Sequence, residues 1–164
     1  MEIINISYNS KVSTNGLEKR LSNLYPYEFI IDDYKMSSWE GFIQSLKSPD
    51  LNVKEKLWGL YGYQAWKQGQ NINWWEKQEV YWIDTPIDRH SDEYTKLITY
   101  SYDCLFNQNE EFRNSLKESI GYKLDHTKGK TNKSETLLTK GEYLYQMERL
   151  RDKLKPKRFF NLFG

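Results

Sequence analysis

The feature that most constrains the fold is a series of short amphipathic segments, each bounded by residues that begin or end helices. Beyond residue 36, apolar side chains recur every three or four positions, which is the spacing of one helix face. Ser, Thr or Asn opens several of these segments with Glu three residues later, and Gly or Pro follows most of them. The pattern predicts helices over residues 37–48, 52–69, 91–106, 110–120 and 139–154.

Strand signals are confined to two parts of the chain. Within the first 36 residues, "EIINIS" alternates apolar and polar positions, and "EFIIDDYKM" combines a strand, an Asp-Asp turn and a short return. Residues 71–88 are expected to be irregular or strand-like, because Trp, Tyr, Val and Ile cluster there around Thr85 and Pro86. Residues 126–136 have no apolar side chain and predict an exposed loop of the kind that often holds ligands.

A chain of 164 residues is long enough for one core of its own and too short for two. We therefore predict an α+β fold, a mostly helical single domain over residues 1–156 with a small N-terminal β element. Residues 157–164 form a basic and aromatic tail. This tail either follows a nucleic-acid backbone with its Phe rings stacked on bases, or docks as an ordinary terminus.

Charge and composition limit the partners and the compartment. The 24 Lys and Arg residues nearly balance the 23 Asp and Glu residues, so any anionic partner must be held locally. No apolar stretch is long enough to span a bilayer, and the single cysteine, Cys104, suits a reducing cytoplasm. The two histidines, His90 and His126, have no Cys or carboxylate cluster at ligand spacing, so neither a metal nor another cofactor is expected. No membrane contact and no stable protein partner are predicted.

The first predicted helix carries an unexplained polar row. Glu40, Gln44 and Lys47 recur at i, i+4 and i+7 beside its apolar face, so a carboxylate, an amide and an amine are aligned. Such a row is usually a solvated face, and Glu40 would be the third residue of a capping box that begins at Ser37. Periodicity alone favours that interpretation over a functional one.

Several motifs resemble one protein family across nearly the whole chain. "LSNLYPYEFIIDDYKMSSWEGFIQSLK" is similar to the opening signature of the NADAR (YbiA-like) family, in which Ser-Asn-aromatic-Tyr-Pro leads to Ser-x-Glu and then Gln and Lys. "AWKQG", "YWIDTPIDRHSDEY" and "FNQNEEFRNSL" follow in the family's order, and "LDHTKGK" and "TLLTKGEYLYQMERLR" resemble the C-terminal pattern of one branch. The chain departs from the family pattern at Leu24, where an aromatic residue is usual, and at Gly41, where His is common.

The resemblance implies an enzyme that breaks a glycosidic C–N bond. NADAR proteins are N-glycosidases of ADP-ribosyl or ribosylamino substrates, and the phage or toxin-associated branch removes ADP-ribose from guanine in DNA. The implied substrate is thus an ADP-ribosyl nucleotide or ADP-ribosylated DNA. Two alternatives stay open: a non-catalytic domain that binds ADP-ribose or a related nucleotide, and a ribosylamino-pyrimidine hydrolase of riboflavin metabolism.

The same resemblance gives the polar row a use. Lys47 would attack the opened sugar to form a Schiff base, Glu40 would move protons, and Gln44 would orient the substrate. In a competing mechanism, Glu40 stabilises an oxocarbenium ion while water attacks the anomeric carbon.

Five further residues are candidates for substrate binding, and four of them have a structural alternative. Asn23 either hydrogen-bonds a base or ribose, or forms a turn. Tyr25 and Trp82 either stack on a base or pack in the core. Arg89 either clamps a pyrophosphate or pairs at the surface with a neighbouring aspartate. His126, at the edge of the exposed loop, is placed for a ligand contact.

Overall fold

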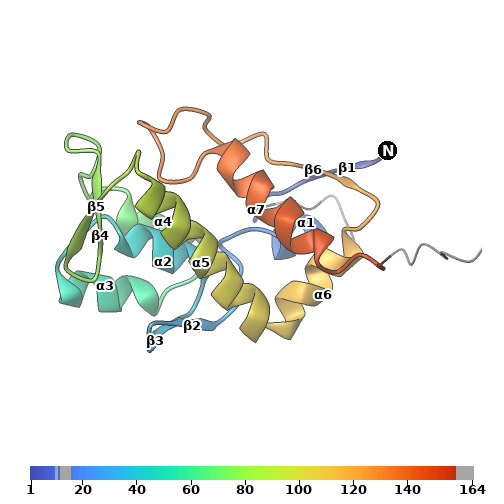
Figure 1. The fold of residues 1–164 in the computed structure, drawn as a ribbon, viewed down its shortest axis with the longest axis horizontal. Helices are drawn as coiled ribbons and strands as arrows, with labels where there is room; N and C mark the ends of the chain where they lie inside the picture. Colours follow the sequence, from blue (N-terminus) through green and yellow to red (C-terminus); the bar gives the residue numbers. More distant parts are fainter. Residues whose placement is uncertain (10, 12–15, 158–164) are drawn as a thin grey trace, which may run out of the picture.

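Seven helices and three two-stranded sheets make up the part of the chain that the computed structural model describes, residues 1–9, 11 and 16–157 (Figure 1). The predicted α+β, mostly helical fold is confirmed. The helices are α1 (Leu17–Arg20), α2 (Trp39–Ser45), α3 (Leu51–Trp58), α4 (Gly62–Gly69), α5 (Asp92–Gln108), α6 (Glu110–Glu118) and α7 (Lys140–Asp152). The tail predicted for residues 157–164 lies outside the described residues except for Lys157.

The two predicted strand regions both form hairpins. β2 (Phe29–Ile31) and β3 (Tyr34–Met36) pair antiparallel around Asp32 and Asp33, whose φ angles of 48° and 70° are those of a tight hairpin turn. β4 (Glu79–Trp82) and β5 (Thr85–Asp88) form the second antiparallel pair, inside the segment expected to be strand-like.

The first strand has a partner that the sequence pattern did not reveal. β1 (Ile3–Asn5) does not join the nearby hairpin but pairs in parallel with β6 (Lys123–Asp125), and Ile4 stands opposite Leu124. The predicted N-terminal β element is therefore two separate sheets, one of which joins the start of the chain to its last third. This pairing sets the position of the loop that follows β6.

Helix boundaries mostly follow the predicted signals. The capping box of Thr139 and Glu142 opens α7 as expected, and Asn109 alone separates α5 from α6. The helix predicted over residues 52–69 is wrong as a single element, because the chain breaks between α3 and α4 and Gly62 takes a φ of 64°. The short helix α1 was not predicted.

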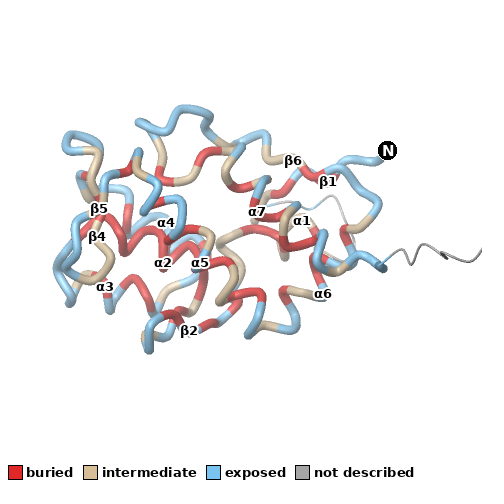
Figure 2. The backbone as a smooth tube through the Cα atoms, in the orientation of Figure 1, coloured by how far each residue is buried: buried red, intermediate tan, exposed pale blue. Residues whose placement is uncertain are grey.

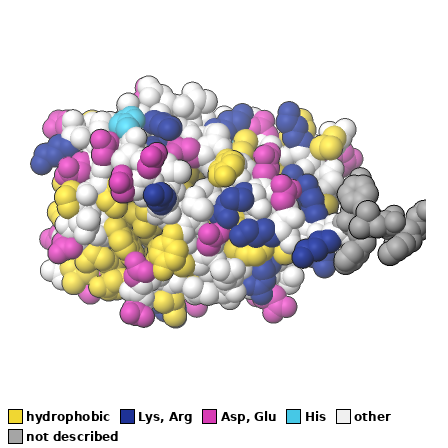
Figure 3. Space-filling model, viewed as in Figure 1, with side chains coloured by type: hydrophobic (Ala, Val, Ile, Leu, Met, Phe, Trp, Pro, Cys, Tyr) yellow, Lys and Arg dark blue, Asp and Glu magenta, His cyan; other side chains and the backbone are white. Residues whose placement is uncertain are grey.

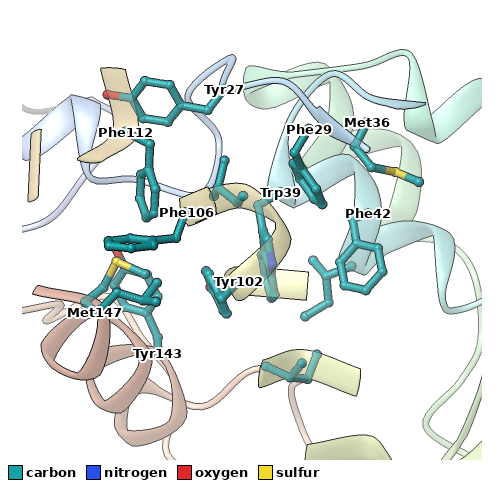
Figure 4. Close-up of a cluster of buried hydrophobic side chains, with 14 of the residues drawn as sticks. Tyr27, Phe29, Met36, Trp39, Phe42, Tyr102, Phe106, Phe112, Tyr143 and Met147 are labelled. Carbon is teal, nitrogen blue, oxygen red and sulfur yellow. The ribbon is translucent and has the colours of Figure 1, made fainter. Parts of the chain in front are cut away.

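Helix α2 lies at the centre of the fold, and every one of its residues is buried (Figure 2). Its Trp39 ring stacks on Tyr102 of α5 at 4.2 Å between centroids, and the two rings face each other in the core (Figure 4). Trp39 also donates a hydrogen bond from Nε1 to Ser101 Oγ at 2.9 Å. A helix fixed this firmly presents its remaining side chains with little freedom.

Two groups of elements flank α5 (Figure 1). Helices α2 to α4 with strands β2 to β5 lie on one side, and α1, α6, α7, β1 and β6 lie on the other. The loop after β6 runs along the upper edge toward α7 and spans the two groups. On the face in Figure 3, hydrophobic side chains gather over the end that carries β4 and α3, and basic side chains spread over the other end. Among the described residues, no helix combines the length and apolar character needed to cross a membrane.

Candidate active site

The start of α2 differs by one residue from the predicted capping box. Ser38, rather than Ser37, is the N-cap, and its Oγ accepts a hydrogen bond from Gly41 N at 3.0 Å. Glu40 is consequently the second helical residue and has no capping role. Its Oε1 instead accepts a hydrogen bond from Gln44 Nε2 at 2.8 Å, one turn along the helix.

The polar row is not a solvated helix face. Glu40, Gln44 and Lys47 are only 8%, 6% and 8% exposed. All three line a pocket of about 960 Å³, a volume typical of sites for nucleotide-sized ligands. The interpretation favoured by periodicity alone is therefore wrong, because the polar stripe beside the apolar face of α2 borders this pocket instead of bulk water.

The end of α4 holds the two last residues of the row. Lys47, in the turn after α2, donates a hydrogen bond from Nζ to Gly69 O at 2.9 Å. The Gln44 side chain lies directly over Gly69, where a β-carbon would come within 1.9 Å of Gln44 Oε1. That Oε1 is buried and has no hydrogen-bond partner among the described residues. The row thus contains an unused acceptor beside an amine and a carboxyl group.

Burial shifts the ionisation of the row toward its neutral forms. Desolvation raises the pKa of Glu40, although the hydrogen bond from Gln44 and the charge of Lys47 oppose this shift. Desolvation likewise lowers the pKa of Lys47 to about 8, opposed by Glu40 and assisted by the nearby positive charge of Lys130. With a pKa of about 8, roughly a tenth of Lys47 is an uncharged amine at pH 7, which is the nucleophilic form.

A second buried lysine supports the end of α2. Lys54 is fully buried, and its Nζ donates to Ser45 O at 2.8 Å and to Tyr81 O at 2.5 Å, so it joins α2 to β4. Trp58 Nε1 donates to Ser45 Oγ at 2.9 Å. These contacts fix the backbone from which Lys47 extends. Sequence reasoning missed Lys54, although its place three residues before Leu57, on the apolar stripe of α3, was an available signal.

Another part of the pocket lining comes from the loop after β6, whose position depends on the β1–β6 pairing. His126 follows β6, and its Nδ1 lies 2.8 Å from Ile6 O, just after β1. Because a carbonyl only accepts, Nδ1 carries a proton, and in the neutral ring Nε2 is then an acceptor. Lys128 and Lys130 of the same loop also line the pocket. The loop predicted to be exposed thus borders the pocket.

Asn23 lines the pocket beside Glu40. Its backbone oxygen accepts from Glu40 N at 3.0 Å, and its Oδ1 accepts from Tyr102 Oη at 2.9 Å. The backbone of Asn23 therefore supports the first turn of α2, and the hydrogen bond from Tyr102 fixes the orientation of its side chain.

Two predicted stacking residues, Tyr25 and Trp82, lie outside the pocket lining and pack, half-buried, against the core. Tyr25 packs against Tyr27 at 4.7 Å between ring centroids. Trp82 of β4 contacts the ring of Phe42 and donates from Nε1 to Asp32 Oδ2 at 2.9 Å. Both rings therefore serve packing, which was the alternative to base stacking.

Arg89 is also outside the pocket lining, and its partner is not a neighbouring aspartate. The side chain is 1% exposed and pairs with Glu142, at 2.6 Å from Nη2 to Oε1 and 3.2 Å from Nη1 to Oε2. Its Nε donates to Thr136 O at 3.0 Å. The surface pair considered for Arg89 is therefore wrong. The guanidinium ties Thr136, which lines the pocket at the end of the loop, to the capping box of α7.

Comparison with known proteins places the chain in a family. The sequence profile described as bacteriophage protein GP30.3 matches residues 17–152, a span that contains every predicted site residue. The chain belongs to the bacteriophage GP30.3 family. A relative, the uncharacterized 17.1 kDa protein of the Gp30–rIII intergenic region of enterobacteria phage T4, is 31% identical over 137 residues, which is 82% of this chain and 90% of the relative.

The GP30.3 family chain also shares the fold of a bacterial protein. The solution NMR structure of Escherichia coli YbiA aligns with a TM-score of 0.58 over 93% of this chain and 84% of YbiA. The sequence identity of 16% makes this a likeness of fold. The YbiA-like fold implied by the motifs is thereby confirmed.

One wall of the pocket in this GP30.3 family chain was not foreseen. Tyr63, Trp66 and Gln70 recur at i, i+3 and i+7 on one face of α4 and its end, and all three line the pocket. Tyr8 and Trp75 extend this wall. The helical spacing of Tyr63 and Trp66 was the available signal, but the same pattern predicts a core stripe equally well.

The donor set of the pocket suits organic substrates better than a metal. In the described part of the chain, no three His, Cys, Asp or Glu side chains gather as ligands for a metal ion. Cys104 lies half-buried against the core, where burial raises the pKa of its thiol, so it is not an activated nucleophile. The buried row itself offers one amine, one carboxyl group and one amide.

Replacing Gly69 by alanine should destabilise the protein through Gln44. The new β-carbon would lie 1.9 Å from Gln44 Oε1, 2.5 Å from Cδ and 2.8 Å from Cβ. We expect urea unfolding to show a loss of about 2 kcal/mol, a typical cost of overpacking. Gln44→Ala removes two of the three colliding atoms, so the Gly69→Ala/Gln44→Ala protein should lose less than the sum of the single losses. Strictly additive losses would contradict this account.

Proposed function

We propose that the protein is an N-glycosidase that removes ADP-ribose from a modified base, with guanine in DNA as the principal substrate. The observation that carries the proposal is the buried row of Glu40, Gln44 and Lys47 on the wall of a nucleotide-sized pocket. An amine of lowered pKa beside a carboxyl group of raised pKa is the pair that this reaction needs. The motif resemblance to NADAR proteins and the likeness of fold to YbiA support the assignment.

The reaction divides between Lys47 and Glu40. The ribose ring first opens as the base nitrogen forms a double bond to C1′ and its proton passes to O4′. The uncharged Lys47 amine then adds to C1′, and Glu40 transfers the protons of the lysine nitrogen to the departing base nitrogen as the C1′–N bond breaks. Water adds to the lysine imine, which releases ADP-ribose and restores the amine, so one water is consumed for each bond broken.

The other pocket residues have complementary tasks in this proposal. Lys128 and Lys130 supply the positive charge for the pyrophosphate of ADP-ribose. Gln44 Oε1 and His126 Nε2 are acceptors for sugar hydroxyl groups, and Asn23 orients the base. Tyr25, Trp82 and Arg89 take no part in binding, because their side chains are used in the packing described above.

Turnover tests the proposal with one conservative change. Wild-type protein should release ADP-ribose from an oligonucleotide that carries ADP-ribosyl-guanine, with the product identified by mass spectrometry. Glu40→Gln keeps the shape and the contact with Gln44 but removes proton transfer, so we expect kcat to fall by roughly 100-fold or more. Glu148→Gln, an exposed glutamate on α7, is the matched control and should be unaffected.

The alternatives give different results in the same assay. A non-catalytic nucleotide-binding domain would bind ADP-ribose saturably and release no product. A ribosylamino-pyrimidine hydrolase would cleave its own substrate and leave the oligonucleotide intact. Equal rates for wild type and Glu40→Gln would remove Glu40 from the mechanism.

A further inference from the structure

The pocket has more exposed aromatic surface than packing explains. Tyr63, Trp66 and Trp75 line it, yet these side chains are 44%, 46% and 47% exposed. Tyr8 contacts Tyr63 edge-on at 5.4 Å between ring centroids and continues the same wall. Large aromatic rings that remain in water at the mouth of a site mark a contact surface for a ligand. We call Tyr63, Trp66 and Trp75 the aromatic platform.

The charges near the platform favour an anionic partner. Lys128 and Lys130 line the same pocket, and outside the buried row Glu135 is its lining carboxylate among the described residues. Within the row, the pKa shifts of Glu40 and Lys47 both favour the neutral form, so these two groups add little net charge. The chain as a whole has a net charge of only +1, so this excess of lysine is local. Aromatic rings beside basic side chains are the composition of grooves that bind single-stranded nucleic acid. A neutral sugar chain would use the rings but gain nothing from the lysines.

A single modified nucleoside does not account for the platform. ADP-ribosyl-guanosine carries two base rings, the adenine and the guanine, and the guanine must lie at the Glu40–Lys47 row. The remaining adenine can cover one ring of the platform and leaves the others in water. Bases that flank the modified one in a strand would cover them, provided that those bases are unpaired.

We propose that the aromatic platform stacks the unpaired bases next to the modified base, so that the protein binds single-stranded nucleic acid in preference to duplex. The inference that the enzyme cleaves its substrate in single-stranded form rests on the proposed function. Binding of an unmodified strand does not rest on it, because such a strand has no ADP-ribose to release. The two proposals can therefore fail separately.

The test is binding of a fluorescein-labelled, unmodified twelve-residue oligothymidine, followed by anisotropy. Wild type should bind it, and the Trp66→Ala/Trp75→Ala protein should bind at least about tenfold more weakly, because each stacked base is worth roughly a factor of five or more. Tyr145→Ala is the matched control, since Tyr145 is 60% exposed on α7 and does not line the pocket. It should bind like wild type.

Two further measurements separate stacking from an unspecific loss of fold or charge. Trp66→Phe/Trp75→Phe keeps aromatic faces and should restore most of the affinity, while the thermal midpoints of all variants should stay close to that of wild type. A duplex of the same length should bind more weakly than the single strand. Equal binding by wild type and the double alanine variant, absence of strand binding by wild type, or a preference for duplex would each overturn the proposal.

Discussion

Replacing Lys47 by alanine should abolish the release of ADP-ribose, with kcat reduced by roughly 1,000-fold or more. In the proposed mechanism the Lys47 amine forms the bond to C1′ and later releases it, so its loss removes the covalent step. Because the pKa of Lys47 is lowered to about 8, the wild-type rate should rise about tenfold per pH unit below that value and level off above it. Lys35→Ala is the matched control, because that side chain is 66% exposed and belongs to the β2–β3 hairpin.

Chemical trapping distinguishes the two mechanisms considered for this reaction. A lysine imine is reduced by cyanoborohydride to a stable secondary amine. Imine formation loses one water and reduction adds two hydrogens, so wild type turning over substrate should gain at Lys47 the mass of ADP-ribose less one oxygen atom. Lys47→Ala should gain no adduct at this position, and Lys35→Ala should gain it at the wild-type rate. Turnover without a trapped adduct would favour water attack on an oxocarbenium ion stabilised by Glu40.

Local signals in the sequence predicted local structure well. The capping box at Thr139, the Asp32–Asp33 turn and the apolar stripes of α5 to α7 each depend on residues within a few positions of one another. The polar row was visible for the same reason. The environment of the row could not be predicted, because a helix face that lines a pocket has the same periodicity as a helix face exposed to water.

Long-range pairing decided what the sequence pattern left open. β1 and β6 are separated by more than a hundred residues, and no local signal joins them, yet their pairing places His126 at the site. Long-range pairing has the opposite effect on Arg89. Its guanidinium is suited to phosphate binding, but it pairs with Glu142 inside the fold and does not reach the site. Functional residues of similar chemistry therefore separate into binding and structural roles only when their distant partners are known.

The position of Glu40 also depends on a backbone contact that only glycine permits. A β-carbon on Gly41 would lie 2.4 Å from Leu57 O and 3.0 Å from Leu60 O, both backbone atoms of the α3–α4 region. Ser38 Oγ donates to the same Leu60 O at 2.8 Å, so α2 is held against these carbonyl groups. A residue with a side chain, such as the His common at this position in NADAR proteins, would require α2 to move away.

Gly41→Ala should therefore destabilise the protein by about 3 kcal/mol and lower its thermal midpoint by roughly 10 °C. Gly59→Ala is the matched control: its β-carbon would approach nothing closer than Lys56 O at 3.7 Å, and Gly59 has an ordinary φ of −84°. Both changes reduce the entropy of the unfolded chain alike, so the difference between them isolates the collision with Leu57 O. Similar stabilities for the two variants would mean that α2 does not depend on this close approach.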